Sequence, residues 1–353
     1  MDYYQFLKKI LFKLDPERAH WLAECGMKFT TDFAPFLLSM AASKYFVTDD
    51  RLEQEIFGVK FLNPVGIAAG FDKNAAMIKA LSAFGFGHVE YGTITPKPQD
   101  GNEKPRLFRH IEEKSLQNAM GFNNEGMEKI LKRISKIYPY TTPLGANIGK
   151  NKATLQEDAT KDYEELVKAF SPFCDYLAIN ISSPNTPNLR ALQNEKFIKE
   201  LFRACVKLTN KPILLKISPD ISEKEAVSVC AAALEEGAYG IIATNTTIDY
   251  SLVTNPKNIG GISGEALKEK SFKIFKSLAK EFYNKTVLIS AGGIGNAKDA
   301  YERLLEGANL VQIYTSFIYE GPSVAHKINK GILELMDKDG FSSIKDAIGS
   351  KRK

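Results

Sequence analysis

The sequence predicts an α/β protein, a (β/α)8 TIM barrel preceded by a small N-terminal helical module. From residue 64 onward, a short apolar run, a polar or glycine cluster and an amphipathic segment repeat along the chain. Strands that alternate with helices indicate parallel βαβ units, and eight near-equal units favour a closed barrel. The alternative, an open doubly wound sheet, is disfavoured because the chain carries no dinucleotide-binding fingerprint. The predicted strands span residues 64–70, 87–94, 144–149, 176–183, 213–218, 240–247, 287–294 and 310–316.

This pattern divides the chain into three segments. We expect residues 1–45 to form the helical module, residues 46–340 the barrel, and residues 341–353 a C-terminal helix with a basic tail. Residues 95–143 form a long polar insertion after the second strand. Loops of this length inside a compact domain are usually functional, so we expect the insertion to cover the top of the barrel.

The first segment has the pattern of amphipathic helices. Phe6, Ile10 and Leu14 recur at helical spacing, and Asp15-Pro16 supplies an N-cap and a first-turn residue for a second helix. Two interpretations remain open. The helices pack on the floor of the barrel, or they lie in a membrane interface with their apolar face in the lipid.

Composition excludes several classes of function. The net charge of +5, from 47 basic and 42 acidic residues, is mild and dispersed, which argues against a nucleic-acid partner. The four cysteines lie far apart without a CxxC pair, so we expect no zinc, iron–sulfur or other metal site. No apolar run approaches the roughly 18–20 residues that span a bilayer.

Residues 180–187 (NISSPNTP) are the most informative string of the chain. Five of these eight side chains carry a hydroxyl or an amide, and the string directly follows an apolar run with the length of a buried strand. In a barrel the active site is built from the carboxyl ends of the strands. No histidine lies in the polar strand ends, so the chemistry there needs a different base.

The strand ends also indicate a flat ligand that carries a phosphate. Glycine-rich strings at 260–264 and 292–295 offer backbone N–H groups, and the loops after the last two strands of such barrels commonly bind phosphate. Lys216 lies within an apolar run and needs a partner, because burial of an unpaired charge is unfavourable. Asp72 is the one carboxylate that we find at a neighbouring strand end, so we expect Lys216 to face a ligand rather than a core carboxylate. FMN fits this description.

Several strings together resemble the dihydroorotate dehydrogenase family over nearly the whole chain. They include NPVGIAAGFDKN at 63–74, KPRLFR at 104–109, NAMGFNN at 118–124, NIGKNK at 147–152 and NISSPNTPNLR at 180–190. Soluble members of the family carry a catalytic cysteine where this chain has Ser183, and the membrane-associated, quinone-using members carry a serine. The N-terminal extension, with LDPERAH at 14–20, also indicates the quinone-using branch.

The resemblance implies a reaction and a role for each site residue. Ser183 would remove a proton from C5 of dihydroorotate while a hydride passes from C6 to the flavin, and Thr186 and water would relay the proton. The quinone head group would lie near His20, Arg106 and Tyr314. The implied FMN contacts are Ala69, Gly70, Phe71, Asp72, Lys73, Thr93, Asn147, Asn180, Lys216, Thr244, Gly264, Gly293, Tyr314 and Thr315. The implied substrate contacts are Lys73, Asn118, Ala119, Met120, Gly121, Phe122, Asn180, Asn185, Asn245 and Thr246.

The resemblance further implies a step of pyrimidine (UMP) biosynthesis at the cytoplasmic side of the cell membrane, with the protein attached peripherally through its N-terminal helices. Three other functions remain open on the residues alone. They are another FMN-dependent barrel oxidoreductase, a barrel aldolase or isomerase with a phosphorylated substrate, and a non-catalytic FMN-binding or membrane-scaffold protein.

Overall fold

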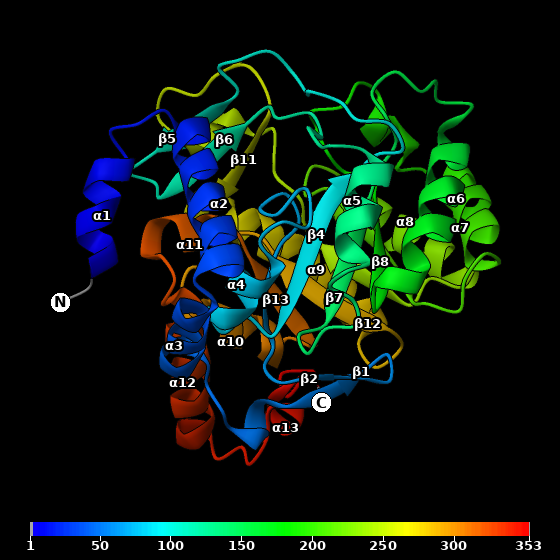
Figure 1. Cartoon of the computed structure of the whole chain (residues 1–353). Helices are drawn as coiled ribbons and strands as arrows, with labels where there is room; N and C mark the ends of the chain where they lie inside the picture. Colours follow the sequence, from blue (N-terminus) through cyan, green and yellow to red (C-terminus); the bar gives the residue numbers. More distant parts are fainter. Residues whose placement is uncertain (1–2, 353) are drawn as a thin grey trace.

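The predicted strands form a closed, fully parallel barrel in the computed structural model, which describes residues 3–352 (Figure 1). Neighbours around the barrel run β3-β4-β7-β8-β9-β10-β12-β13, and β13 pairs with β3 to close it. The fold-class prediction is therefore confirmed. The strands are β3 (Val65–Ile67), β4 (His88–Ile94), β7 (Leu144–Ile148), β8 (Tyr176–Asn180), β9 (Ile213–Ile217), β10 (Gly240–Ala243), β12 (Val287–Ala291) and β13 (Leu310–Ile313).

Most strands end before the predicted runs do. The run 176–183, for example, leaves the sheet after Asn180, because Ile181, Ser182 and Ser183 turn into the loop at the top of the barrel. The polar residues that made these runs informative are thus loop residues at the carboxyl ends of the strands, which is where a barrel carries its chemistry.

Amphipathic helices surround the barrel and bury their apolar faces against it. Helix α8 shows why one such segment begins where it does: Ser222 accepts from the Glu225 N–H, and the Glu225 side chain accepts from the Ser222 N–H, which makes a capping box. The outer helices are α4 (Ile78–Ala83), α5 (Met127–Ile134), α6 (Ala159–Phe170), α7 (Glu195–Val206), α8 (Glu223–Glu235), α9 (Lys268–Phe282), α10 (Ala297–Leu305) and α12 (Val324–Asp339). The helices α11 (Thr315–Glu320) and α13 (Ile344–Ala347) complete the set.

A hairpin that the sequence did not predict closes the amino end of the barrel. Its strands, β1 (Gln54–Ile56) and β2 (Val59–Phe61), are joined by Phe57 and Gly58, both with positive φ. Ile56 and Phe61 pack into one buried cluster with residues of the barrel strands, among them Leu214. This hairpin, and not the N-terminal helices, forms the floor of the barrel (Figure 1).

The insertion after β4 contributes a small antiparallel sheet above the barrel. Its strands are β5 (Leu107–His110) and β6 (Ser115–Asn118), and β11 (Gly261–Gly264) pairs with β6. The three strands lie together at the upper left of Figure 1. They bring the glycine-rich string at 260–264 beside Asn118, since Gly261 is the register partner of Asn118.

The N-terminal helices are α1 (Tyr3–Leu11), α2 (Pro16–Phe33) and α3 (Pro35–Tyr45), and they lie along one side of the barrel (Figure 1). Asp15 caps α2, as predicted, by accepting from the N–H groups of Glu17 and Arg18. From the insertion, Arg106 bonds both carboxylate oxygens of Glu17 at 3.2 and 2.7 Å. Arg109 donates to the carbonyl oxygens of Leu11, Phe12 and Leu14 at the end of α1.

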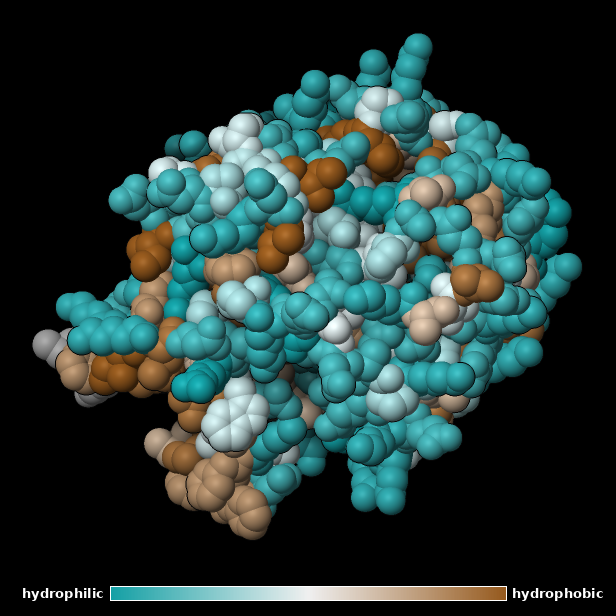
Figure 2. Space-filling view, turned by 90° about the horizontal axis from the view of Figure 1, so that it is seen from above, coloured by the Kyte–Doolittle hydropathy of each residue, from teal (hydrophilic) through white to brown (hydrophobic). Residues whose placement is uncertain are grey.

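These helices turn large apolar side chains to the solvent. Trp21, Phe29, Phe33, Phe36 and Met40 each keep 59% or more of their surface exposed. Figure 2 shows apolar side chains gathered where the N-terminal helices protrude from the body of the protein, at the lower left. We call these five residues, with Phe6 and Ile10 of α1, the apolar face. No helix among residues 3–352 combines the length and the apolar character needed to cross a membrane.

Candidate active site

A cavity of about 540 Å³ opens at the carboxyl ends of the barrel strands. Its lining includes loops after most of the barrel strands, together with the small sheet that covers the top. Most of the site residues predicted from the sequence meet there. They are Ala69, Gly70, Lys73, Thr93, Asn118, Met120, Gly121, Phe122, Asn180, Ser183, Asn185, Lys216, Thr244, Asn245, Thr246, Gly264, Gly293, Tyr314 and Thr315.

One wall of the cavity is a glycine loop braced by a buried arginine. Gly292 and Gly293 both have positive φ, and a Cβ on Gly293 would lie only 2.3 Å from the Cα of Lys268. Arg303 donates to the carbonyl oxygens of Gly292 and Lys268 at 3.2 and 3.0 Å, and burial lowers its pKa to about 9. The loop leads into α10, whose N-cap is Asn296. Backbone N–H groups and a helix N-terminus at one wall are suited to hold an anion.

The inner end of the cavity is a chain of hydrogen-bonded amides and hydroxyls. The Asn180 Nδ2 donates to Thr93 Oγ1 at 3.0 Å and to Asn147 Oδ1 at 3.1 Å. In turn the Asn180 Oδ1 accepts from Ser182 Oγ at 3.0 Å and from Asn245 Nδ2 at 3.3 Å. Because each member fixes the next, the donor and acceptor directions offered to a ligand are set in advance.

Lys216 has a carboxylate partner, which corrects the expectation from the sequence. Its Nζ lies 3.2 Å from Oε1 of Glu90, which is fully buried within β4. Glu90 also accepts from Asn147, Tyr176 and Gln312 at 2.9, 3.1 and 2.7 Å. Burial alone would raise the pKa of Glu90, but the Lys216 charge and these hydrogen bonds hold it below its ordinary value. Lys216 still lines the cavity, so the pair presents an ammonium to a ligand.

The expectation was wrong because the carboxylate partner of Lys216 does not lie at a strand end. Glu90 lies in the middle of the run GHVEYGTI, and β4 is not a neighbour of β9 in the barrel. A glutamate inside an otherwise apolar strand was the available signal.

The opposite wall carries polar atoms that no described residue satisfies. The Asn185 Nδ2 donates to Asn118 Oδ1 at 3.0 Å, whereas the Asn185 Oδ1 and the Thr246 Oγ1 are buried without a partner among residues 3–352. Lys73 lines the cavity, and within the described chain it makes no hydrogen bond or ion pair. Burial lowers the pKa of Lys73, against the opposing charges of nearby acids. A ligand with a carboxylate and amide edges would satisfy all of these groups.

Ser183 lies at the cavity with only 5% of its surface exposed. Its Oγ accepts from the N–H of Asn185 at 3.2 Å, which leaves the hydroxyl proton available to a further acceptor. Thr186 is buried outside the cavity lining, and its Oγ1 has no partner among residues 3–352.

Four other predicted residues lie behind the cavity wall. Asp72 accepts from the N–H groups of Ala76 and Met77 at 2.8 and 2.7 Å, so its carboxylate holds a turn of the backbone. Asn147 belongs to the buried hydrogen-bond chain. Ala119 and Phe71 do not line the cavity either.

Two of the three residues predicted at the quinone head group pack against Phe71. Its ring packs edge-on against His20 and Tyr314, with centroids 5.0 and 5.6 Å away. Burial, with the Lys73 charge, lowers the pKa of His20, so its imidazole is neutral at physiological pH. Arg106 lies outside the cavity lining, where Glu17 pairs with it.

Some residues at the cavity were not predicted from the sequence. Ser263 and Thr315 share a hydrogen bond of 2.8 Å, which ties β11 to the start of α11. Residues 263 and 315 lie far apart in the sequence, so only the three-dimensional arrangement shows that they meet. Ser263 and Gly292 lie in the glycine-rich strings that the sequence indicated, whereas the lining residues Asn296, Gln312 and Ser316 were not predicted.

Comparisons with known proteins agree with this geometry. Residues 51–336 match the family described as dihydroorotate dehydrogenase. The chain is 58% identical to the dihydroorotate dehydrogenase (quinone) of a Nitratiruptor species and 56% identical to that of Sulfurimonas denitrificans, with 99% of each chain covered in both cases. The crystal structure of the ligand-free type DHODH from Eimeria tenella superposes with a TM-score of 0.83 at 36% identity, covering 92% of this chain and 99% of that one. The chain therefore belongs to the dihydroorotate dehydrogenase family, in its quinone-dependent branch.

Proposed function

We propose that the cavity binds FMN and that Ser183 is the general base in the oxidation of dihydroorotate to orotate, with a membrane quinone as the final electron acceptor. Oxidation of dihydroorotate with a quinone, in pyrimidine biosynthesis, is the activity of the family branch to which the chain belongs, and the family is flavin-dependent. The family match leaves the aldolase, isomerase and non-catalytic alternatives without support. We therefore propose the identity of the cofactor and the roles of the individual residues.

The residues around the glycine loop suit FMN. The loop at Gly292 and Gly293 would receive the phosphate, and the Lys216 ammonium and the amide chain would face the polar edge of the ring system. Gln312 Oε1 and Ser316 Oγ are buried without a partner among the described residues and offer further contacts. FMN held by these residues would supply the hydride-accepting chemistry and the electron transfer to the quinone.

The opposite wall suits the pyrimidine. Lys73 would pair with the carboxylate of dihydroorotate, because an unpaired ammonium in a closed site favours an anion. Asn118, Asn185 and Asn245 offer the donor and acceptor pairs that the amide and imide edges of the ring require.

Ser183 would take the proton from C5. A serine is a weak base, so the charge that develops on its oxygen needs stabilisation and its own proton needs an acceptor. The N–H of Asn185 would stabilise the charge on the serine oxygen, since it already donates to Ser183 Oγ. Thr186 Oγ1, buried and without a partner among the described residues, is suited to accept the serine proton through a water.

The apolar face would lie in the membrane interface at the cytoplasmic side, where a long-tailed quinone is dissolved. Lys9, Lys13 and Lys44 lie on or beside the same helices and are suited to contact lipid head groups. His20 of α2 contacts Phe71, which contacts Tyr314 at the cavity, and Arg106 pairs with Glu17 of the same helix. We place the quinone head group beside these residues.

The observation that carries the proposal is the wall of Lys73, Asn118 and Asn185, which suits an anionic pyrimidine and faces the glycine loop across the cavity. The test is an acceptor assay on the purified protein with dihydroorotate as donor. We expect turnover with a quinone and none with NAD or fumarate, and FMN should be released on denaturation. Turnover with NAD but not quinone would contradict the proposed acceptor, and a colourless active protein would contradict the proposed cofactor.

A further inference from the structure

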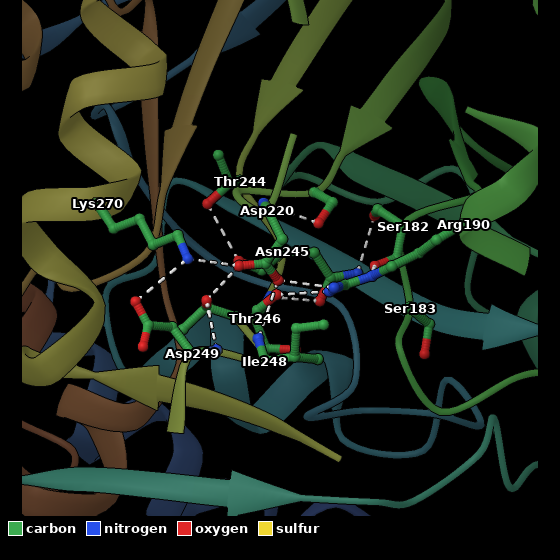
Figure 3. A network of polar contacts seen from close by, with 12 residues as sticks. Ser182, Ser183, Arg190, Asp220, Thr244, Asn245, Thr246, Ile248, Asp249 and Lys270 are labelled. Carbon is green, nitrogen blue, oxygen red and sulfur yellow. Dashed lines mark hydrogen bonds and ion pairs between the residues drawn. The ribbon is translucent and has the colours of Figure 1, made fainter. Parts of the chain in front are cut away.

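Two charged residues outside the cavity tie together the loops that carry the proposed base and part of the pyrimidine site. Arg190 lies on a short 3-10 helix, Leu189–Leu192, in the loop after β8. Its Nε donates to the Ser182 carbonyl oxygen at 2.9 Å, and one terminal nitrogen donates to the Thr246 carbonyl oxygen at 2.7 Å. The other terminal nitrogen pairs with Asp220 Oδ2 at 2.7 Å (Figure 3).

Asp220, in the loop after β9, extends the connection to the loop after β10 and to α9. It accepts from the Thr247 hydroxyl, from the Ile248 N–H at 2.9 Å and from Lys270 Nζ at 2.7 Å. Burial alone would raise the pKa of Asp220, but these bonds and the Arg190 charge hold it below its ordinary value. The carboxylate therefore stays charged and keeps all its partners at physiological pH.

The two carbonyl groups that Arg190 bonds belong to residues next to or within the proposed active site. The Ser182 carbonyl belongs to the peptide bond that leads into Ser183, and the Thr246 carbonyl belongs to a residue whose side chain lines the cavity. Figure 3 shows Ser183 beside this network without a bond to any residue drawn in it. Neither Arg190 nor Asp220 lines the cavity. They can reach a ligand only through the loops that they hold.

We infer that Arg190 and Asp220 form a positioning pair that sets the distance between Ser183 and the pyrimidine held by Asn245 and Thr246. This inference rests on the proposed function of Ser183. A planar guanidinium can hold two carbonyl groups and a carboxylate in one fixed arrangement, which a lysine cannot. Proton transfer depends steeply on this distance, since a displacement of about 1 Å can slow a reaction on the order of 100-fold.

The test measures flavin reduction by dihydroorotate in the FMN-loaded, full-length Arg190→Met and Asp220→Asn variants by stopped flow. We expect Arg190→Met to slow reduction at saturating substrate by about 10- to 100-fold, with orotate affinity changed less than about 3-fold. Deuterium at C5 should slow reduction more in Arg190→Met than in the unaltered protein, because proton removal becomes the slower part of the reaction. Arg190→Lys keeps the positive charge and should recover part of the rate of flavin reduction. It serves as the second variant in case Arg190→Met does not fold.

Arg203→Met is the matched control, since Arg203 of α7 pairs with Glu236 at the end of α8 and neither residue lines the cavity. It should reduce flavin at the unaltered rate. A second control is the Ser183→Ala, Arg190→Met double variant. If Arg190 acts through Ser183, its loss should slow the Ser183→Ala protein little further.

The outcomes separate the two claims. If Ser183→Ala reduces flavin normally, the proposed base is wrong. If Ser183→Ala is slow while Arg190→Met keeps the unaltered rate and isotope effect, the positioning pair is wrong and the base stands. A loss of orotate affinity as large as the loss of rate, or full additivity in the double variant, also overturns the positioning role.

Discussion

Lys216 and Glu90 form a buried ion pair across the interior of the barrel, with 3.2 Å between Nζ and Oε1. The side chain of Glu90 is fully buried and that of Lys216 is 6% exposed. The pair lies at the inner end of the cavity, where it joins the amide chain through Asn147. Its charge is therefore part of both the core and the proposed flavin site.

Removing one partner of this pair should destabilise the barrel. Glu90→Leu leaves the Lys216 ammonium buried without a counter-charge, and breaking a buried pair in this way costs about 3–5 kcal/mol. The Glu90→Leu, Lys216→Met double variant should recover much of that loss, because neither charge remains buried. Urea denaturation of the FMN-free proteins measures the free energy of unfolding of the single and the double variant. Equal losses in the single and double variants would show that the pair does not act as a unit.

His88 should make stability depend on pH. It is fully buried, and burial lowers its pKa from 6.5 to about 4. Between these values the unfolded chain binds a proton that the folded chain does not, so stability falls as pH falls from about 6.5 to 4, by roughly 3 kcal/mol in all. His88→Leu should flatten the stability curve in this window, as followed by urea denaturation at a series of pH values. An unchanged pH dependence would assign it to other groups.

Lys73 should govern affinity for the anionic product. Lys73→Met removes the proposed counter-charge of the carboxylate, and a hydrogen bond to a charged group is worth about 1.5–3 kcal/mol, or about 10- to 100-fold in the dissociation constant of orotate. The dissociation constant is measured by adding orotate to the FMN-loaded protein and following the absorbance of the bound flavin. Lys79→Met, an exposed lysine of α4, is the control and should bind orotate normally. Equal affinities in the two variants would argue for a different anion site.

The apolar face should be needed for the quinone half of the reaction only. Changing Phe29, Phe33 and Phe36 to Ser removes exposed apolar surface without touching the barrel core. We expect weaker binding to lipid vesicles and slower reduction of a long-tailed quinone, with flavin reduction by dihydroorotate unchanged. Leu155→Ser, which changes an equally exposed apolar residue elsewhere, is the control. Vesicle binding equal to that of the unaltered chain would exclude this face as the membrane contact.

Local sequence patterns predicted the barrel because the hydrophobic pattern of each strand and helix is recognisable within a few residues. The same patterns could not predict that β11 pairs with β6, since Ser263 and Leu116 are 147 residues apart. They also missed the β1–β2 hairpin, although Phe57-Gly58 between two short alternating runs was an available turn signal.

The candidate site was predictable to the extent that its residues follow strands. Ser183, Asn185 and Thr246 lie in polar strings at strand ends, and the cavity gathers them. Glu90 and Arg190 act from positions that depend on which strands face each other and which loops touch. Such contacts between distant segments carry no local signal, so the ion pair and the proposed positioning pair emerged only from the structure.

The central claim is that Ser183 removes the proton from dihydroorotate while the substrate reduces bound FMN. The most direct measurement is stopped-flow flavin reduction by dihydroorotate, without quinone, in the unaltered protein and in Ser183→Ala with FMN bound. We predict that Ser183→Ala slows reduction by about 10²–10⁴-fold, that FMN content is unchanged, and that Ser183→Cys keeps part of the rate with a lower pH optimum because a thiol ionises more readily. Reduction of Ser183→Ala at the unaltered rate would contradict the account.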